Sequence, residues 1–447
     1  MAKIRFPHPL TLLLGFIFLA AALSWVLPAG EFQRRDDPAT GRSVVIPGTF
    51  HAVPAAPVSP FRALISIPKG LEDAADVVFV VFLVGASFVV VDRTGVLRRG
   101  VDRLVAGLQG RTLVVIPAVS ILSALGGVMI NMQEEFIGLI PALLILTRRM
   151  GFDPLVAVAM SLGAAAVGSA FSPINPFQVG IAQKLAQLPL LSGAPFRVAF
   201  LVLALAVWIW VTMRYAVRTR VAPEAAAAGA VEGSGARDAV VLLLVLGTFA
   251  LYVYGSLKLE WGFDEMGALF FAMGVVAGLV GGLRVGGTVE AYVDGFRDLA
   301  FAGLLIGFAR AIYVVLQQGR IVDTIVHGVV TPIAGLPVAL SALGMMAAHI
   351  LIHFPVPSVS GQAVLTMPVL VPVSDLLGLS RQVTVLAYQY GAGLTELVAP
   401  TNGALMAILI AAGVRYDRWL RFVLPLFAGL LGLGAVAVIV GIVTGLR

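Results

Sequence analysis

Two short polar motifs interrupt long apolar stretches of this sequence, SPINP at 172–176 and APTNG at 399–403. Proline lacks a backbone N–H and clashes with the preceding helical turn, so Pro173 and Pro400 release carbonyl groups from helical hydrogen bonding. Freed carbonyls joined by hydroxyl and amide oxygens make a neutral cage that suits a hard cation such as Na⁺. The amides that open the next half-helix attract an anionic group. The alternative is an ordinary proline kink, which membrane helices tolerate.

Carboxylates inside the apolar chain could also do chemistry. Glu134 and Glu135 are adjacent in the segment GGVMINMQEE. Carboxylates at membrane depth are expensive, and these two could bind a substrate ammonium group, carry a coupling proton, or be held structurally by backbone amides. Glu396 lies one turn before Pro400 and could be a proton carrier, a cation ligand or a buried hydrogen-bonded group.

Three other side chains in apolar stretches are weaker candidates. Arg310 could counter a substrate carboxylate, pair with a hairpin glutamate, or serve structurally by snorkelling or by forming an ion pair. His349 and His353 lie one turn apart, which is ligand spacing, but no acidic or third ligand stands beside them in the sequence. This spacing alone does not predict a metal site.

Composition identifies the class of protein that must position these groups. Hydrophobic residues make up 59% of the chain, charged residues 12%, and the mean hydropathy is +0.99. A soluble domain is roughly half apolar and a quarter charged, so these values predict a polytopic membrane protein. The net charge of +6 does not indicate nucleic-acid binding, because the arginines are dispersed at the ends of apolar segments, where they set topology.

Two apolar segments, 136–150 and 362–376, are too short to span a bilayer, and each follows another apolar segment through a polar bend. We therefore expect two re-entrant hairpins, at 112–150 and 333–376, since irregular backbone survives at membrane depth only inside protein or beside water. With a cytoplasmic amino terminus, this topology places the arginines near the ends of the spans inside. They are Arg98, Arg99, Arg103, Arg111, Arg148, Arg149, Arg214, Arg218, Arg220, Arg415, Arg418 and Arg421.

An internal repeat is the strongest signal in the sequence. Residues 134–177 align without a gap on 361–404, an offset of 227, and this alignment superimposes the two polar motifs. The matched identities are Pro141 with Pro368, Gly151 with Gly378, Pro173 with Pro400 and Asn175 with Asn402. An odd number of crossings separates the copies, so we expect inverted repeats, an architecture typical of secondary transporters.

The predicted fold is therefore an all-α polytopic membrane protein with two inverted-topology repeats, each with a re-entrant hairpin and a broken transmembrane helix. Four regions follow in chain order. They are a first transmembrane helix and external polar loop (1–74), repeat 1 (75–217, hairpin 112–150, broken helix 155–187), a cytoplasmic linker with two connecting helices (218–296), and repeat 2 (297–447, hairpin 333–376, broken helix 381–414).

Several segments resemble a known family. LPAGEF, GGVMINMQEE, NPFQVGIAQ, RYAVRTRVAP and APTNG are similar to the YfcC-like branch of the DcuC (C4-dicarboxylate anaerobic carrier) family, within the ion transporter superfamily. The resemblance runs along nearly the whole chain. It implies a bacterial inner-membrane carrier of carboxylates or amino acids, a homodimer, and a transport region of hairpins and broken helices that moves as an elevator. It also implies sodium sites built from Ser-Asn-Thr motifs, of which this chain keeps Asn175, Thr401 and Asn402 but carries NMQEE and SVSG at the hairpin tips.

We predict an ion-coupled secondary transporter of a small charged metabolite, with an amino acid or related zwitterion favoured over a C4-dicarboxylate. The predicted substrate-binding residues are Asn131, Gln133, Glu134, Glu135, Asn175, Ser358, Ser360, Gln362 and Asn402. The residues predicted to couple transport to Na⁺ or H⁺ are Ser172, Asn175, Ser360, Glu396, Thr401 and Asn402, with Na⁺ at Asn175 and Asn402. No other cofactor is expected. An intramembrane hydrolase is disfavoured because its nucleophile, aspartyl and zinc motifs are missing, and a passive channel because paired breaks suit alternating access better.

Overall fold

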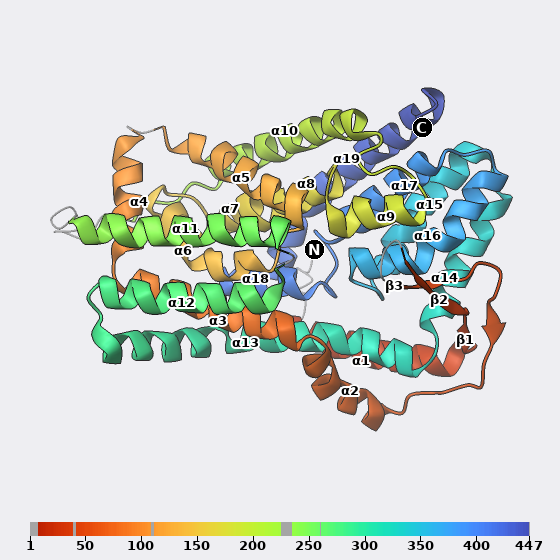
Figure 1. Cartoon of the computed structure of the whole chain (residues 1–447), viewed down its shortest axis with the longest axis horizontal. Coiled ribbons are helices and arrows are strands. Elements are labelled where there is room, and N and C mark those ends of the chain that lie inside the picture. Colours follow the sequence, from red (N-terminus) through yellow and green to blue (C-terminus); the bar gives the residue numbers. More distant parts are fainter. Residues whose placement is uncertain (1–7, 39–41, 109–110, 225–234, 260, 447) are drawn as a thin grey trace, which may run out of the picture.

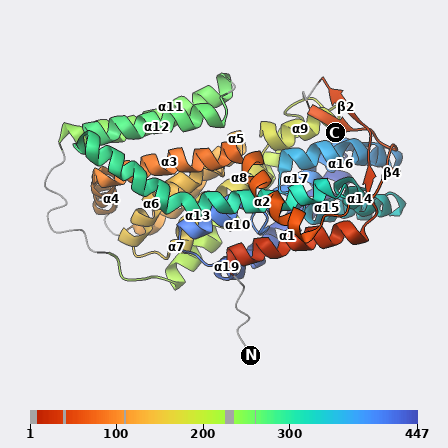
Figure 2. The ribbon, with the colours of Figure 1, turned by 90° about the horizontal axis from the view of Figure 1, so that it is seen from below.

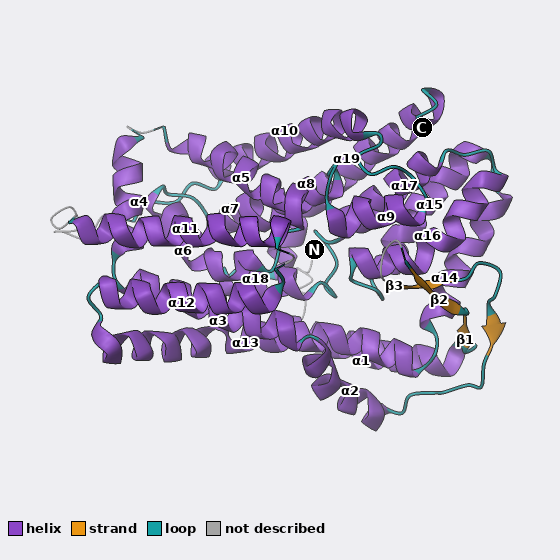
Figure 3. Ribbon diagram, in the orientation of Figure 1, coloured by secondary structure: helices purple, strands orange, loops and turns teal. Residues whose placement is uncertain are grey.

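The computed structural model describes residues 8–38, 42–108, 111–224, 235–259 and 261–446, and its regular structure is mostly helical (Figures 1 and 3). Eight helices in these residues are long and apolar enough to cross a membrane, judged by length and composition. The first of them is α1 (Pro9–Val26) and the last is α19 (Tyr416–Val443). This agrees with the polytopic membrane protein predicted from composition.

The segment predicted as an external polar loop contains regular structure of its own. Its strands are β1 (Gly30–Glu31), β2 (Arg34–Asp37), β3 (Arg42–Val45) and β4 (His51–Ala52), in antiparallel pairs β1 with β4 and β2 with β3. An amphipathic helix, α2 (Pro60–Asp73), follows. It begins where the Ser59 hydroxyl accepts a hydrogen bond from the Arg62 N–H at 3.3 Å. The all-α prediction is therefore wrong for this segment, because strand pairs satisfy its backbone groups.

The next elements cover 75–185, which includes the segments predicted as hairpin 1 and the first broken helix. The helices are α3 (Ala75–Arg93), α4 (Val96–Gly107), α5 (Val115–Ile130), α6 (Glu135–Arg149), α7 (Pro154–Val158), α8 (Ala164–Ala170) and α9 (Ile181–Leu185). A 3₁₀ turn (Thr112–Val114) precedes α5, and π-helical segments (Ala159–Gly163 and Pro176–Gly180) flank α8 and the break. The break itself lies at 171–175, as the SPINP motif predicts.

The two arms of hairpin 1 diverge from a turn at Asn131, which ends α5 in the left-handed conformation (φ 56°). Helix α5 packs along α8, whereas α6 packs along α3. Glycine makes the first contact close, because a Cβ atom at Gly127 would overlap the backbone carbonyl of Ala165. Similarly, a Cβ atom at Gly168 would overlap the carbonyl of Ala124. Hairpin 1 is thus held by neighbouring helices on two different sides.

Four helices follow, from the end of predicted repeat 1 to the start of predicted repeat 2. They are α10 (Ala194–Arg218), α11 (Ala236–Lys258), α12 (Phe263–Val280) and α13 (Arg284–Gln318). The 35-residue α13 runs without interruption through 296/297, the predicted boundary between the connecting region and repeat 2. It packs along α2, α3 and α18, so one long helix joins elements from distant parts of the chain.

The chain from α14 onward shows the same order of elements as the chain from α4 to α10. Its helices are α14 (Val322–Val330), α15 (Val338–His353), α16 (Val359–Leu376), α17 (Arg381–Thr395), α18 (Gly403–Ala411) and α19, with a 3₁₀ turn (Thr331–Gly335) before α15. Helix α16 starts at Val359, earlier than the predicted 362, and its 18 residues are long enough to cross a membrane. The second break lies between α17 and α18, where APTNG predicts it.

The two hairpins lie on opposite sides of the broken helices. Figure 1 shows α5 and α6 toward the left and α15 and α16 toward the right, and Figure 2 shows the same separation after a quarter turn. The first halves of the broken helices, α8 and α17, pack against each other in between. A Cβ atom at Gly393 on α17 would meet the backbone of Ala170 on α8. The broken helices therefore form the centre of the fold.

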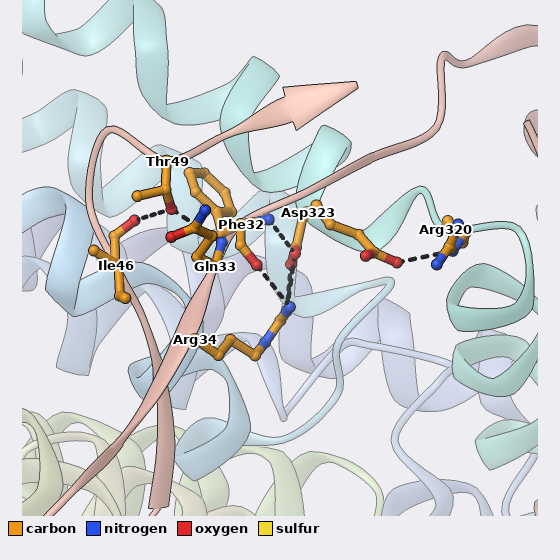
Figure 4. A network of polar contacts seen from close by, with 8 residues as sticks. Phe32, Gln33, Arg34, Ile46, Thr49, Arg320 and Asp323 are labelled. Atoms are coloured by element: carbon orange, nitrogen blue, oxygen red, sulfur yellow. Dashed lines mark hydrogen bonds and ion pairs between the residues drawn. The ribbon is translucent and has the colours of Figure 1, made fainter. Parts of the chain in front are cut away.

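Polar contacts fasten the strand-bearing segment to α14 (Figure 4). The buried carboxylate of Asp323 accepts a hydrogen bond from the Phe32 N–H at 2.9 Å and pairs with Arg34 at 2.7 Å. Arg320, just before α14, pairs with Glu31 at 2.9 Å. Strand β3 also packs against α16, the second arm of hairpin 2. These contacts therefore fix the strand-bearing segment to α14 beside hairpin 2.

The close approach at Gly127 yields a stability prediction. In Gly127→Ala the added methyl group must push α5 away from α8, and we expect the free energy of unfolding to fall by about 1–3 kcal/mol. Thermal unfolding in detergent, followed by circular dichroism, measures the change. Gly15→Ala on α1 is the control, because a Cβ atom there meets nothing within 4 Å. Equal melting temperatures for the two variants would contradict this packing argument.

Candidate functional site

A cavity of about 370 Å³ lies between the tips of the two hairpins. Six of the predicted site residues line it together: Asn131, Glu134, Glu135, Ser358, Ser360 and Glu396. They come from the turn between α5 and α6, from the start of α16, and from the residue that follows α17. The structure therefore brings both tips and the approach to the second break to one place.

Three carboxyl groups face this cavity, and they differ in their partners. Glu134 is half-buried, whereas Glu135 and Glu396 are only 5% and 7% exposed. The Glu135 carboxylate accepts a hydrogen bond from the backbone N–H of Gln133 at 2.9 Å. Among the described residues no ion pair involves any of the three. Buried carboxylates without a basic partner are stable when they carry a proton or hold a cation.

Two predicted substrate ligands, Gln133 and Gln362, do not line the cavity. The buried Gln133 amide donates a hydrogen bond to the Glu396 carboxylate, which links hairpin 1 to the end of α17. The Gln362 side chain lies inside hairpin 2, where its Nε2 donates to the His349 carbonyl at 2.8 Å. Its Oε1 lies 3.1 Å from the His353 ring. Both amides therefore join elements of the fold.

The side chain of Asn175 caps the second half of the first broken helix. Its Oδ1 accepts hydrogen bonds from the N–H groups of Phe177 at 2.9 Å and Gln178 at 3.1 Å. Its Nδ2 donates to the Gly127 carbonyl in hairpin 1 at 2.8 Å. Asn175 is fully buried. The oxygen predicted to bind substrate or Na⁺ is thus occupied by backbone amides.

The freed backbone at the first break also finds protein partners. The Ser172 hydroxyl donates to the Val128 carbonyl at 2.8 Å and accepts from the Asn175 N–H at 2.8 Å. The Ser172 carbonyl accepts from the Gln389 amide on α17 at 2.6 Å. Gln389 is in turn held by Arg197 on α10, a fully buried arginine, at 2.8 Å. Sequence reasoning missed Arg197, because its position at the start of a span resembles an ordinary interfacial arginine.

The second break follows the same design with one difference. Asn402 caps α18, accepting from the Leu405 N–H at 3.2 Å, and its Nδ2 donates to the Glu396 carbonyl at 3.3 Å. The hydroxyl of Thr401 is buried and has no hydrogen-bond partner among the described residues. Of the side-chain oxygens at the breaks, Thr401 Oγ1 is therefore the one left for a ligand. The described residues contain no group of three His, Asp or Glu side chains that could hold a metal ion.

An aromatic wall completes the cavity, and sequence reasoning missed it. Four aromatic side chains line it: Tyr252 on α11, Trp261 and Phe263 at the start of α12, and Phe177 just after the first break. Tyr252 interacts with the carboxyl group of Glu135. Trp261 packs on Gly255, where a Cβ atom would overlap its ring. The aromatic residues between 252 and 263 could have indicated this wall, but they lie in the helices that were predicted only to connect the two repeats.

The remaining candidates lie outside the cavity. Arg310 forms an ion pair with Asp73 at the end of α2 and stacks over Tyr313 at 5.1 Å. This is the structural alternative among the three roles considered for it. His349 and His353 share Gln362 between them inside hairpin 2.

Two solved structures align along most of the chain. The YdaH transporter of Alcanivorax borkumensis is 18% identical, with a TM-score of 0.46, over 98% of this chain and 99% of its own. MtrF of Neisseria gonorrhoeae, described with a class of antimetabolite efflux pumps, is 18% identical, with a TM-score of 0.40, over 98% of this chain and 95% of its own. These values are too low to assign a function by fold.

Relatives in sequence match over nearly their whole length. A protein of Escherichia coli K12 named "Putative basic amino acid antiporter YfcC" is 30% identical over 97% of this chain and 96% of its own. An uncharacterized protein of Haemophilus influenzae Rd is 29% identical over 98% of this chain and 97% of its own. The family model for C4-dicarboxylate anaerobic carriers matches residues 6–443, which include both hairpin tips and both breaks. The resemblance seen in the sequence is confirmed, and the chain belongs to the DcuC family of carriers.

Proposed function

We propose that this membrane transporter exchanges a small organic cation, most simply an amino acid with a cationic side chain, for protons. The observation that carries the proposal is the composition of the cavity. Among the described residues, its walls hold three carboxyl groups without a basic ion-pair partner and four aromatic rings, and no described arginine, lysine or histidine lines it. Carboxylates and aromatic faces together favour an ammonium or guanidinium group.

A zwitterion also needs a partner for its carboxylate, and the start of α16 supplies one. Ser358 caps this helix, accepting a hydrogen bond from the Gly361 N–H at 3.2 Å. The N–H groups of Val359 and Ser360 belong to the first turn and have no intrahelical acceptor. Helix amino ends carry partial positive charge and bind anionic groups. A substrate could therefore place its carboxylate at α16 and its cation near Glu134 and Trp261.

The family name suggests a C4-dicarboxylate as the second candidate. A dianion in this cavity would face Glu134, Glu135 and Glu396, with no basic side chain among the described residues of the wall. Negative charges that share one poorly solvated cavity repel each other strongly. We therefore place the dicarboxylate second, and the name of the E. coli relative, a basic amino acid antiporter, supports this order.

For the coupling ion, the contacts favour H⁺ over Na⁺. The amide oxygens of Asn175 and Asn402, which would have formed a sodium cage, cap the half-helices that follow them. The carboxyl groups of Glu135 and Glu396 are nearly buried and can exchange a proton for a bound cation. Glu396 also connects to the tip of hairpin 1 through Gln133, so its protonation state can influence both hairpin and break.

We further propose the mode of action and the setting. The protein works by an elevator form of alternating access, with the hairpins and broken helices as the moving part and inverted repeats as its basis. The recurrence of hairpin, broken helix and closing helix in both halves supports this. We place it in the bacterial inner membrane as a homodimer with a cytoplasmic amino terminus.

The proposed function predicts uptake of cations. In proteoliposomes with an outward-directed proton gradient, we expect saturable uptake of labelled lysine, arginine or ornithine, abolished by a protonophore and unchanged when Na⁺ is replaced by choline. Labelled fumarate and succinate serve as the anionic arm of the same assay. Uptake of the dicarboxylates without uptake of any cationic amino acid would refute the proposal.

Neutralising Glu134 tests whether a cavity carboxylate contacts the substrate. Glu134→Gln removes a charge that the substrate cation contacts, so uptake efficiency, measured as kcat/KM, should fall about tenfold or more. Glu290→Gln is the matched control, because Glu290 is exposed on α13 and outside the cavity. Identical kinetics for the two variants would remove Glu134 from the site.

A further prediction concerns the contact between the aromatic wall and the substrate. In Gly255→Ala the methyl group displaces the Trp261 ring from its seat, so uptake should weaken roughly as in Trp261→Leu, by about three- to tenfold. Gly247→Ala on the same helix is the control, since a Cβ atom at Gly247 meets nothing within 4 Å. Full uptake in both Gly255→Ala and Trp261→Leu would show that the ring does not contact substrate.

A further inference from the structure

Helices α10 and α19 border a groove of about 660 Å³, separate from the cavity between the hairpin tips. Four arginines gather in it: Arg214, Arg218, Arg418 and Arg421. Two of them come from the last turns of α10 and two from the first turns of α19, which are about 200 residues apart in the sequence. The rest of the groove is largely apolar, with side chains such as Val207, Val211 and Leu426.

The positive charge of this groove is only partly balanced. Arg418 pairs with Asp153, and Arg421 pairs with Asp417 at 2.8 Å. Neither Arg214 nor Arg218 forms an ion pair with any described residue. Both are exposed, and Arg214 stacks over the Trp210 ring at 5.5 Å. At least two cationic groups are therefore available to an anionic ligand.

The distribution of charged and apolar side chains in the groove fits the boundary between lipid headgroups and acyl chains. Its arginines lie where two membrane-spanning helices end, and its apolar part continues along the same helices. Only 22% of the apolar window of α10 and 33% of that of α19 is buried inside the protein. Tryptophan and arginine at the end of a span are typical of headgroup depth, and exposed aliphatic side chains of hydrocarbon depth.

We propose that this groove binds an anionic phospholipid. The phosphate lies among Arg214, Arg218 and Arg418, whose guanidinium groups match phosphate oxygens in geometry and charge. The acyl chain lies along Val207, Val211 and Leu426. Basic pockets between helices at the cytoplasmic surface recognise such headgroups.

Charge argues against the other occupants of this surface. A second copy of the chain meeting it through a two-fold axis would bring the same arginines face to face, with like charges opposed. Free inorganic phosphate would satisfy the arginines but leave the apolar part of the groove empty. A phospholipid satisfies both parts with one molecule.

Bound lipid should also stabilise the protein. Arg418, in the groove, pairs with Asp153, whose carboxylate accepts a hydrogen bond from the Leu155 N–H at 2.9 Å and thereby caps α7. The groove therefore adjoins the start of the first broken helix. Because the ligand binds the folded state, it raises the melting temperature.

The experiment measures lipid binding to the detergent-purified protein by native mass spectrometry, together with its melting temperature. The probes are phosphatidylglycerol, phosphatidylcholine with the same acyl chains, and inorganic phosphate. We expect phosphatidylglycerol to bind and to raise the melting temperature, and the other two probes to do neither. In the double variant Arg214→Gln/Arg218→Gln, binding should weaken about 30-fold, because each arginine contributes at the anionic headgroup.

Two further variants complete the design. Arg297→Gln, which removes an exposed arginine on α13, should bind phosphatidylglycerol like the parent. Gly429→Trp fills the groove and keeps every arginine, so it should weaken binding without changing charge. Size-exclusion chromatography with light scattering checks that each variant keeps the parent's mass.

Three results would overturn the proposal. They are equal binding of phosphatidylglycerol and phosphatidylcholine, unchanged binding in the arginine double variant, and stabilisation by inorganic phosphate equal to that by lipid. A smaller oligomer in the double variant would instead assign the groove to a second copy of the chain.

Discussion

The structure depends on one constraint: backbone groups freed at the two helix breaks must find hydrogen-bond partners where water is scarce. Asn175 and Asn402 meet it by the same device, capping the half-helix that follows each proline motif. The carbonyl of Ser172 is satisfied by Gln389, which Arg197 holds in place. Because these partners come from α10 and α17, satisfying the breaks also fixes how the helices around them pack.

This constraint divides the polar residues of the centre into two groups. The side chains of Asn175, Ser172 and Gln133 form hydrogen bonds that hold hairpin 1 to the two broken helices. The side chain of Gln362 joins the two arms of hairpin 2. The carboxyl groups at the cavity have no basic partner among the described residues and remain available. The chemistry of the cavity therefore follows from what the fold leaves unpaired, and acidic and aromatic groups are what it leaves.

Much of the architecture could be predicted from the sequence. The 19-residue apolar run at 75–93 is long enough to span, and α3 has the same limits. Pro173 and Pro400 place both breaks, because proline cannot continue a helix. The sequence predicted only a polar loop where α2 and the strands lie, and it did not predict the π-helical segments beside the first break. The roles of Asn175 and Gln362 were predicted less well, since residue type does not reveal which partner a polar side chain meets.

Residues close together in the chain and contacts between distant residues thus determined different features of the protein. The sequence by itself determined the apolar helices, the two proline breaks and the presence of carboxylates at a hairpin tip, because each depends on residues close together in the chain. Only the tertiary structure decided that Glu396 meets Gln133, that Trp261 and Tyr252 face the tips, and that arginines of α10 and α19 share a groove. The reason is physical: these neighbours are tens to hundreds of residues apart in sequence, and packing rather than local conformation brings them together.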